Sequence, residues 1–359
     1  MTPHPSRSDA GFSLPEVMVS MGIMLVVLAG TFSAMTNAMQ AEQTARGITT
    51  LNGHLRASMD VLVRDLLQVG QGLQVGRVVG IPNGVGATQI TRPGPAAAGA
   101  CAGVTPFPLS PTLSAVTVGP DLGPPINGQC TDVITTLALD GAFERVTVDA
   151  IAADAQSITI NAATNISDDP DVNGDNVRVG DLLEIRRGAV AVIVAVTDVA
   201  AQVVTFAPGD PLGLNQFGAA LNNSMTQVQA APLAGGTQAN RVRMITYYVD
   251  TLTNPASPRL MRQINGQPAN AVAFELEAFR LTYDLANGVT NPVGVRMDDD
   301  DLGVAGACAP SACSPNQIRK ANVTLAIRSE KKNASAGYYH NTLFTQVALR
   351  SLAFVDRYN

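Results

Sequence analysis

Residues 17–36 read VMVSMGIMLVVLAGTFSAMT, and this stretch decides the fold. Nearly all of its side chains are apolar or small, and no Asp, Glu, Lys or Arg occurs in residues 17–41. About 20 apolar residues suffice for a helix to cross the hydrocarbon core of a bilayer. A core helix of a soluble protein would carry a polar face, and a cleaved secretory signal has a shorter apolar region of about 7–15 residues. The stretch therefore predicts a retained transmembrane helix.

The residues in front of this stretch carry the motif GFSLPEV at positions 11–17, behind a polar start with one Arg and one Asp. The motif and the apolar run behind it resemble the class III leader of type IV prepilins and pseudopilins. The resemblance implies that a prepilin peptidase cuts after Gly11 and that Phe12 becomes an N-methylated amino terminus. It also makes Glu16 the family's glutamate at the fifth mature position.

Glu16 stands at the front of an apolar run, where an ionised carboxylate is costly and is kept when it has a partner. In the pilin family that partner is the amino terminus of a neighbouring subunit, so the resemblance implies an assembly role for Glu16. The alternative is a glutamate that only stays in the headgroup layer. Pro15 is compatible with a helix start, because the first turn has free N–H groups.

An amphipathic pattern follows the apolar run, with apolar residues at spacings of three and four. The residues of this stripe are Ile48, Leu51, Leu55, Met59, Leu62, Leu66 and Val69. The charged residues expected off the stripe are Arg46, Arg56, Asp60, Arg64 and Asp65. Gly70 and Gly72 end the pattern. We therefore expect one helix of about 87 Å, with a transmembrane part at 12–36 and an amphipathic part at 37–70.

The remaining chain predicts β-structure, because short runs alternate with Gly, Pro, Asn and Asp. Residues 83–128 predict a loop with few strands, and residues 215–238 a polar linker. Two series of strands are expected. The first lies at 133–139, 145–150, 157–161, 182–187, 190–197 and 202–206. The second lies at 241–250, 259–263, 271–283, 318–328 and 343–354.

The second series, with runs such as RVRMITYYVD at 241–250 and VALRSLAFVDRYN at 347–359, resembles the C-terminal half of PilW-type minor pilins. The predicted fold class is α+β, with the long N-terminal helix packed on an antiparallel, β-rich, pilin-like head. In this scheme residues 1–11 are the leader, 241–359 form the C-terminal sheet of the head, and 71–240 are a β-rich insertion or second subdomain.

Composition excludes several classes of protein. The 359 residues are 46% hydrophobic and 14% charged, which suits a packed core rather than a disordered chain. The net charge is −6 and Lys occurs at only three positions, so the basic stripe of a nucleic-acid binder is missing. Trp is absent and aromatics are 4%, which disfavours a stacking platform for single strands or sugars.

Four cysteines are candidates for disulfides, because an exported domain meets an oxidising compartment. They are Cys101, Cys130, Cys308 and Cys313, and three pairings are possible. The local pairing, Cys101 with Cys130 and Cys308 with Cys313, is favoured because it closes two loop-rich segments. A zinc site would need CxxC spacing or nearby His, and neither is present.

Two acidic segments are candidate ligand sites. Asp169, Asp171, Asn173 and Asp175 alternate as in the start of a calcium loop, with a Gly in sixth place. The twelfth position is Gly180 instead of a bidentate Glu, so a solvated turn is favoured and calcium binding stays open. The acidic run at 298–301 predicts a solvated loop.

No catalytic site is expected, and no metal or cofactor is indicated. The sequence contains no GxSxG, HExxH or P-loop pattern. The three histidines are scattered: His4 lies in the leader, His54 on the long helix, and His340 is expected on the surface or on an edge strand.

The resemblance implies a minor pilin of a type IV pilus, a structural subunit that primes or caps filament assembly. Its partners would be the prepilin peptidase, other minor and major pilins, and the inner-membrane assembly machinery. It would cross the inner membrane once, with its head in the periplasm, and then join the cell-surface pilus. Alternatives are a J-type pseudopilin of type II secretion and, less favoured, a membrane-tethered ligand-binding or enzymatic domain.

Overall fold

A computed structural model of the chain describes residues 12–73, 78–95, 101, 107, 111–143, 145–161, 177–232, 236–304, 306–332 and 337–354. Gly11 and His4 therefore lie outside the described residues, and so do the four candidate calcium ligands at 169–175. The chain forms two compact units. The first unit comprises residues 1–52 and 329–339, and the second comprises residues 53–328 and 340–359.

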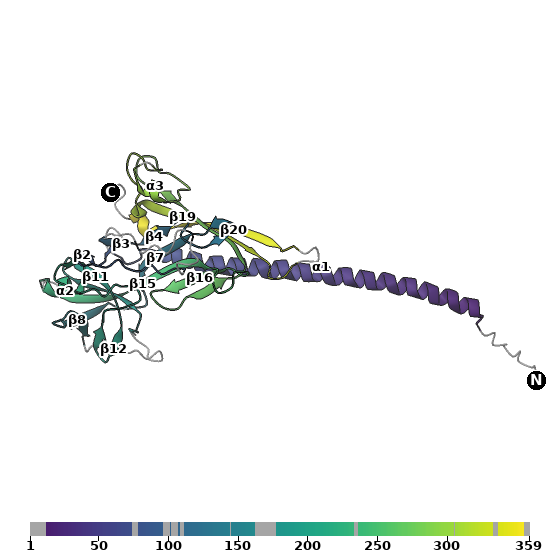
Figure 1. Cartoon of the computed structure of the whole chain (residues 1–359), viewed down its shortest axis with the longest axis horizontal. Helices are drawn as coiled ribbons and strands as arrows, with labels where there is room; N and C mark the ends of the chain where they lie inside the picture. Colours follow the sequence, from purple (N-terminus) through teal and green to yellow (C-terminus); the bar gives the residue numbers. More distant parts are fainter. Residues whose placement is uncertain are drawn as a thin grey trace, which may run out of the picture. The chain divides into compact units, whose positions relative to one another are not determined.

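The N-terminal helix α1 runs from Leu14 to Gln68 and is continuous (Figure 1). Apolar residues of the predicted stripe from Leu51 onward are buried, whereas Ile48 is 39% exposed. The helix ends where predicted, because Gly70 and Gly72 adopt positive φ of 72° and 73°, which side chains disfavour. Just after the helix, the Gly70 N–H donates to the Leu137 carbonyl, and this bond ties the turn to the large sheet.

Antiparallel strands follow α1, as the predicted α+β class requires. Among the described residues, eleven strands form the large sheet: β4 (Val116–Gly119), β7 (Val133–Leu139), β8 (Val146–Ile151), β9 (Ser157–Ile160), β10 (Leu182–Arg187), β11 (Val190–Ala195), β12 (Asp198–Ala200), β13 (Val203–Thr205), β15 (Thr237–Asp250), β16 (Arg259–Ile264) and β17 (Asn270–Ala273). Three form a second sheet in the order β18 (Leu276–Leu285), β19 (Ile318–Arg328) and β20 (His340–Ala348).

Short elements complete the fold. Three two-stranded ladders join β1 (Val78–Gly80) to β3 (Thr112–Ser114), β2 (Asn83–Gly84) to β14 (Leu221–Asn222), and β5 (Pro125–Ile126) to β6 (Gln129–Cys130). The short helices are α2 (Met225–Ala230), α3 (Asp299–Leu302), η2 (Pro315–Gln317) and η3 (Arg350–Phe354).

Strand β15 organises the large sheet, because each of its halves is paired on both edges. Its first half lies between β8 and β10, and its second half between β7 and β16. Strands from the predicted segment 71–240 and from the predicted segment 241–359 therefore share one sheet. The boundary at residue 240 falls inside β15, and the insertion at 71–240 stays a prediction.

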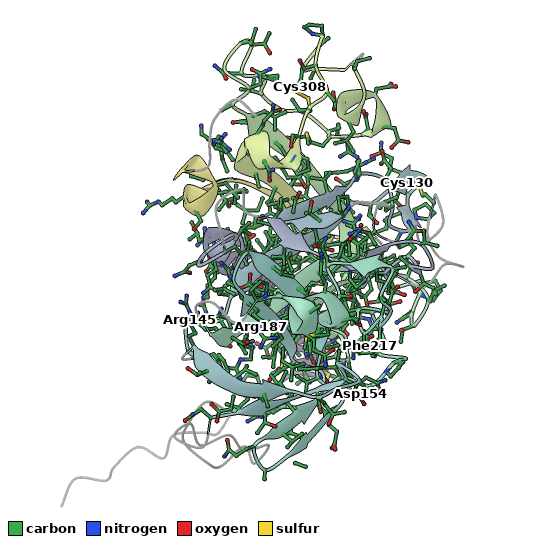
Figure 2. The ribbon with its side chains drawn as sticks, turned by 90° about the vertical axis from the view of Figure 1, so that its left-hand side faces the viewer. Cys130, Arg145, Asp154, Arg187, Phe217 and Cys308 are labelled. Carbon is green, nitrogen blue, oxygen red and sulfur yellow. A yellow bond between two sulfur atoms is a disulfide. The ribbon has the colours of Figure 1, made fainter. Side chains whose placement is uncertain are left out.

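One apolar core lies among β8, β9, β10, β11, β13 and α2. Phe143 and Phe206 belong to it, and Phe217 packs against it from outside. The Arg187 guanidinium donates to the Val228 and Gln229 carbonyls at the end of α2, which holds this helix to β10. Figure 2 shows Arg187 and Phe217 in this part of the second unit and Cys308 at its opposite end.

The predicted linker at 215–238 is wrong. Asn215 is buried, and its side chain bonds the Ala195 and Ala207 backbones. Met225 and Val228 of α2 are buried in the apolar core. The polar residues of this segment bind backbone groups or face outward, so polarity alone suggested a linker where the chain is packed.

Candidate functional site

The start of α1 places the predicted processing and assembly residues next to one another. Phe12 is 84% exposed, and the helix begins two residues later. The Glu16 Oε2 accepts hydrogen bonds from the Ser13 N–H at 3.0 Å and from the Ser13 hydroxyl at 2.9 Å. Glu16 therefore caps the helix by reaching back to the residue in front of it, which is the Glu half of an S-x-x-E capping box.

This cap is a role for Glu16 that the sequence interpretation missed, although the S-x-x-E spacing was the signal for it. The carboxylate neutralises free donors at the helix start, where a negative charge is also favoured by the helix dipole. The Glu16 side chain remains exposed. Its charge can therefore meet a second donor, such as an amino terminus, while it still caps its own helix.

Behind the cap, α1 exposes apolar side chains on all sides. The exposed large residues run from Leu14, at 76%, to Phe32, at 64%, and Met35, at 60%. Within the described residues, α1 is one helix whose length and composition suit a membrane span. Such a surface is unfavourable in water, so it needs lipid or other apolar helices around it.

Three hydroxyl groups of this segment, those of Ser20, Thr31 and Thr36, bond to the helix backbone. Ser20 donates to the Val17 carbonyl at 2.9 Å, and Thr31 donates to the Leu28 carbonyl at 2.8 Å. Hydroxyls that are satisfied in this way present no unpaired donor to a hydrocarbon phase. The segment is therefore suited to lipid in its polar groups as well as in its apolar ones.

The C-terminal part of α1 carries a buried ionic contact, and the expected exposure of its acidic residue is wrong. Asp65 was expected off the buried stripe but is only 7% exposed. It accepts two hydrogen bonds from Arg262 of β16, at 2.6 and 3.1 Å, and one from the Tyr247 hydroxyl of β15 at 2.5 Å. Burial and the Asp65 charge raise the pKa of Tyr247, so its hydroxyl stays a donor.

These contacts join the helix residues of the second unit to its large sheet. Nearby, the Ser58 hydroxyl donates to the carbonyl of Val272 in β17 at 2.5 Å. Leu62 and Leu66, on the same stretch of helix, are almost fully buried. The end of α1 is therefore packed through both apolar and polar groups.

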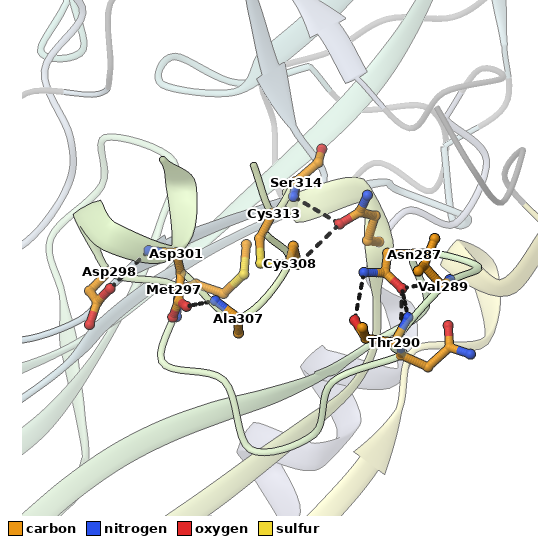
Figure 3. Close-up of a disulfide and its surroundings, with 12 residues drawn as sticks. Asn287, Val289, Thr290, Met297, Asp298, Asp301, Ala307, Cys308, Cys313 and Ser314 are labelled. Carbon is orange, nitrogen blue, oxygen red and sulfur yellow. Dashed lines mark hydrogen bonds between the residues drawn. A yellow bond between two sulfur atoms is a disulfide. The ribbon is translucent and has the colours of Figure 1, made fainter. Parts of the chain in front are cut away.

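Both disulfides have the local pairing that the sequence favoured. Cys101 pairs with Cys130, and Cys308 pairs with Cys313. The second disulfide closes a short loop between α3 and η2 (Figure 3). The Cys308–Cys313 bridge therefore restrains one irregular segment, whereas the Cys101–Cys130 bridge closes a stretch that also contains β3, β4 and β5.

The acidic run at 298–301 belongs to a short helix and not to the expected loop, although Asp298, Asp299 and Asp300 are exposed as expected. It forms α3, with Asp298 as its N-cap, and Asp301 is buried. The Asp301 carboxylate accepts the Met297 and Ala307 N–H groups at 2.9 Å each (Figure 3). Because backbone N–H groups on both sides of α3 donate to it, this carboxylate holds the disulfide loop in place.

Two of the three histidines lie in the described part of the chain. His54 is exposed on α1, and His340 is exposed at the start of β20, an edge strand, where its Nδ1 lies 2.7 Å from Glu277. No group of three or more His, Cys, Asp or Glu in the described ranges could hold a metal ion. The predicted calcium segment is outside those ranges, and Asp181 beyond it pairs with Arg241.

Comparison with known families bears on the N-terminus. The model of the prokaryotic N-terminal methylation motif matches residues 6–32, which include Gly11, Phe12 and Glu16. No curated protein and no solved structure matches the chain. The matched motif indicates a type IV pilin-like protein, and it implies processing by a prepilin peptidase.

Proposed function

We propose that the chain is a minor pilin of a type IV pilus, made as a membrane-anchored prepilin and matured by cleavage between Gly11 and Phe12. One observation carries the proposal: the methylation motif at 6–32 leads directly into a capped helix whose apolar surface is exposed. A leader that is read by a peptidase and a helix that needs an apolar environment fit a subunit stored in lipid.

In this proposal the protein acts by assembly rather than by chemistry of its own. The apolar part of α1 holds the subunit in the inner membrane and later packs against helices of neighbouring subunits. Small residues such as Gly30 and Ala34 permit close helix approach. The second unit lies in the periplasm and joins other minor and major pilins at the filament.

The mass of the N-terminal peptide tests the processing step. Membranes from cells with the prepilin peptidase should yield a chain that begins at N-methylated Phe12, and membranes from cells without it should yield an uncut chain. A chain uncut in both, or cut after the apolar run, would overturn the pilin proposal.

Glu16 variants separate its two roles. Glu16→Gln keeps an oxygen that can accept from the Ser13 N–H but removes the charge, whereas Glu16→Ala removes both. If the charge recruits a neighbouring amino terminus, both variants should be cleaved normally and both should be lost from sheared filaments. Normal incorporation of Glu16→Gln would restrict Glu16 to capping the helix.

The choice between a minor pilin and a J-type pseudopilin is tested by deleting the gene. The minor-pilin proposal predicts few surface pili and the chain itself in sheared pili from wild-type cells. Abundant pili together with a block in protein secretion would instead identify a pseudopilin. The PilW-type runs at 241–359 support the pilus side of this choice.

A further inference from the structure

The first unit contains a loop that packs beside α1 just beyond its apolar segment. Residues 329–339 connect β19 to β20, yet they group with helix residues 1–52 rather than with their own strands. The Tyr339 hydroxyl donates to the Thr44 hydroxyl oxygen at 3.0 Å. This bond sets the height of the loop along the helix axis.

That height is close to the expected membrane surface. Thr44 follows Thr36, the end of the apolar stretch, by eight residues, or about 12 Å along a helix axis. Headgroups extend about 5–8 Å beyond the hydrocarbon core on each side of a bilayer. A loop anchored at Thr44 therefore lies a few ångströms outside the headgroup layer when residues 17–36 fill the core, which a long, flexible side chain can bridge.

The described residues of this loop carry side chains that suit such a surface. Ser329 and Tyr339 close its base, with the Ser329 N–H donating to the Tyr339 carbonyl at 2.7 Å. Lys331 and Lys332 lie beyond this base and are exposed, and the Lys332 ammonium lies 5.5 Å from the ring centroid of half-buried Tyr338. Lysine extends its ammonium toward headgroups on a flexible stem, and Tyr favours the membrane interface.

Two of the chain's three lysines lie in this loop, near the level of the expected membrane surface. The chain has only three lysines and a net charge of −6, and two of the three are these neighbours. Glu330, beside them, is also exposed and offsets part of their charge. On the helix, Glu42 is paired with Arg46 and so does not oppose them.

We infer that Lys331, Lys332 and Tyr338 form a second membrane contact, which binds anionic phospholipid headgroups while α1 spans the bilayer. The inference rests on the proposed membrane anchor. Its role would be to fix how the first unit stands on the membrane before the subunit leaves the lipid. Each lysine near an anionic surface favours binding about fivefold.

The chain has no Trp, so a single Trp can report on this contact. The test uses full-length Tyr338→Trp in vesicles of phosphatidylcholine, or of equal parts phosphatidylcholine and phosphatidylglycerol. Each vesicle includes lipid brominated near the headgroup end of its acyl chains. We expect stronger quenching in the anionic vesicles. Lys331→Gln or Lys332→Gln should weaken loop binding about fivefold, and Glu330→Gln should strengthen it.

Two controls make the outcomes distinct. Lys320→Gln removes the third lysine, which lies on β19 in the second unit, and should leave the quenching unchanged. Met24→Trp, measured with lipid brominated near the ends of its acyl chains because this position lies deep in the expected span, reports whether the apolar segment is inserted. Quenching at position 24 without quenching at 338, or quenching at 338 that ignores lipid charge and both lysines, would overturn the loop contact alone. Absence of quenching at position 24 would overturn the membrane anchor as well.

Discussion

Asp65 follows Leu62 by three residues and precedes Val69 by four, so on a helix it shares their buried face. Its charge suggested a solvated position, but its spacing was the better guide. Burial is tolerated because Arg262 and Tyr247 satisfy the carboxylate, and Arg262 lies 197 residues away in the chain. One side chain therefore connects the end of α1 to the centre of the large sheet.

Breaking this contact should be costly, because it leaves charged and polar groups buried without partners. We expect Asp65→Ala to lower the free energy of unfolding by about 3 kcal/mol, measured by chemical denaturation of the full chain in detergent. Asp60→Ala, an exposed carboxylate on the same helix, is the matched control and should change it by less than about 0.5 kcal/mol. Equal effects of the two variants would contradict the importance of the Asp65 contact.

Asp250 predicts a pH dependence. Burial opposes its ionisation, but hydrogen bonds from Thr253, Arg259 and Leu252 outweigh it and lower its pKa to about 2. The pKa of an Asp in the unfolded chain is about 3.9. The folded state therefore gains stability above about pH 4 and loses it as the pH falls toward 2.

Accordingly, Asp250→Asn should destabilise the chain by about 1–2 kcal/mol at neutral pH and have little effect near pH 2. Unfolding of the wild type and the variant across this range provides the measurement, with exposed Asp198→Asn as the control. A cost that is independent of pH would show that the side-chain geometry matters and the charge does not.

At the scale of elements, local sequence pattern predicted many strands well. The runs at 133–139, 182–187 and 318–328 are β7, β10 and β19 with the expected bounds. The predicted strand at 271–283 is broken into β17 and β18, where Glu275 takes a positive φ of 53°. The predicted strand at 343–354 ends with β20, and η3 follows it. An interruption of a strand such as the one at Glu275 leaves no trace in the alternation of apolar and polar residues, so the sequence pattern does not predict it.

The two disulfides differ in what they should contribute. Their cysteines are 29 and 5 residues apart in sequence. Since closing a longer loop removes more entropy from the unfolded chain, replacing Cys101 and Cys130 together by Ala should cost about 3.5 kcal/mol, against about 2 kcal/mol for Cys308 and Cys313. Thermal unfolding of the two double variants measures the order. The reverse order would indicate that packing of the buried Cys308 and Cys313 dominates.

At the scale of the whole molecule, the apolar segment of α1 should decide where the protein resides. Lysines in place of Val26 and Val27 would each cost about 3 kcal/mol in the centre of a membrane helix. We expect this double variant to be released from membranes by alkaline extraction, whereas the wild type stays bound. Glu42→Lys, which lies outside the segment, serves as the control. Retention of the double variant would contradict a membrane span at residues 17–36.

By itself the sequence determined the features that depend on neighbours in the chain: the leader motif, the apolar run, the end of α1 just before Gly70 and most strands. Motif chemistry and periodicity act over a few residues, so they can be read along the chain. Tertiary structure alone decided the four partners of β15, the burial of Asp65 and Asp301, and the packing of residues 215–238. Each of these depends on backbone and side-chain groups that only folding brings within bonding distance, and a linear pattern does not encode which distant donor will satisfy a buried acceptor.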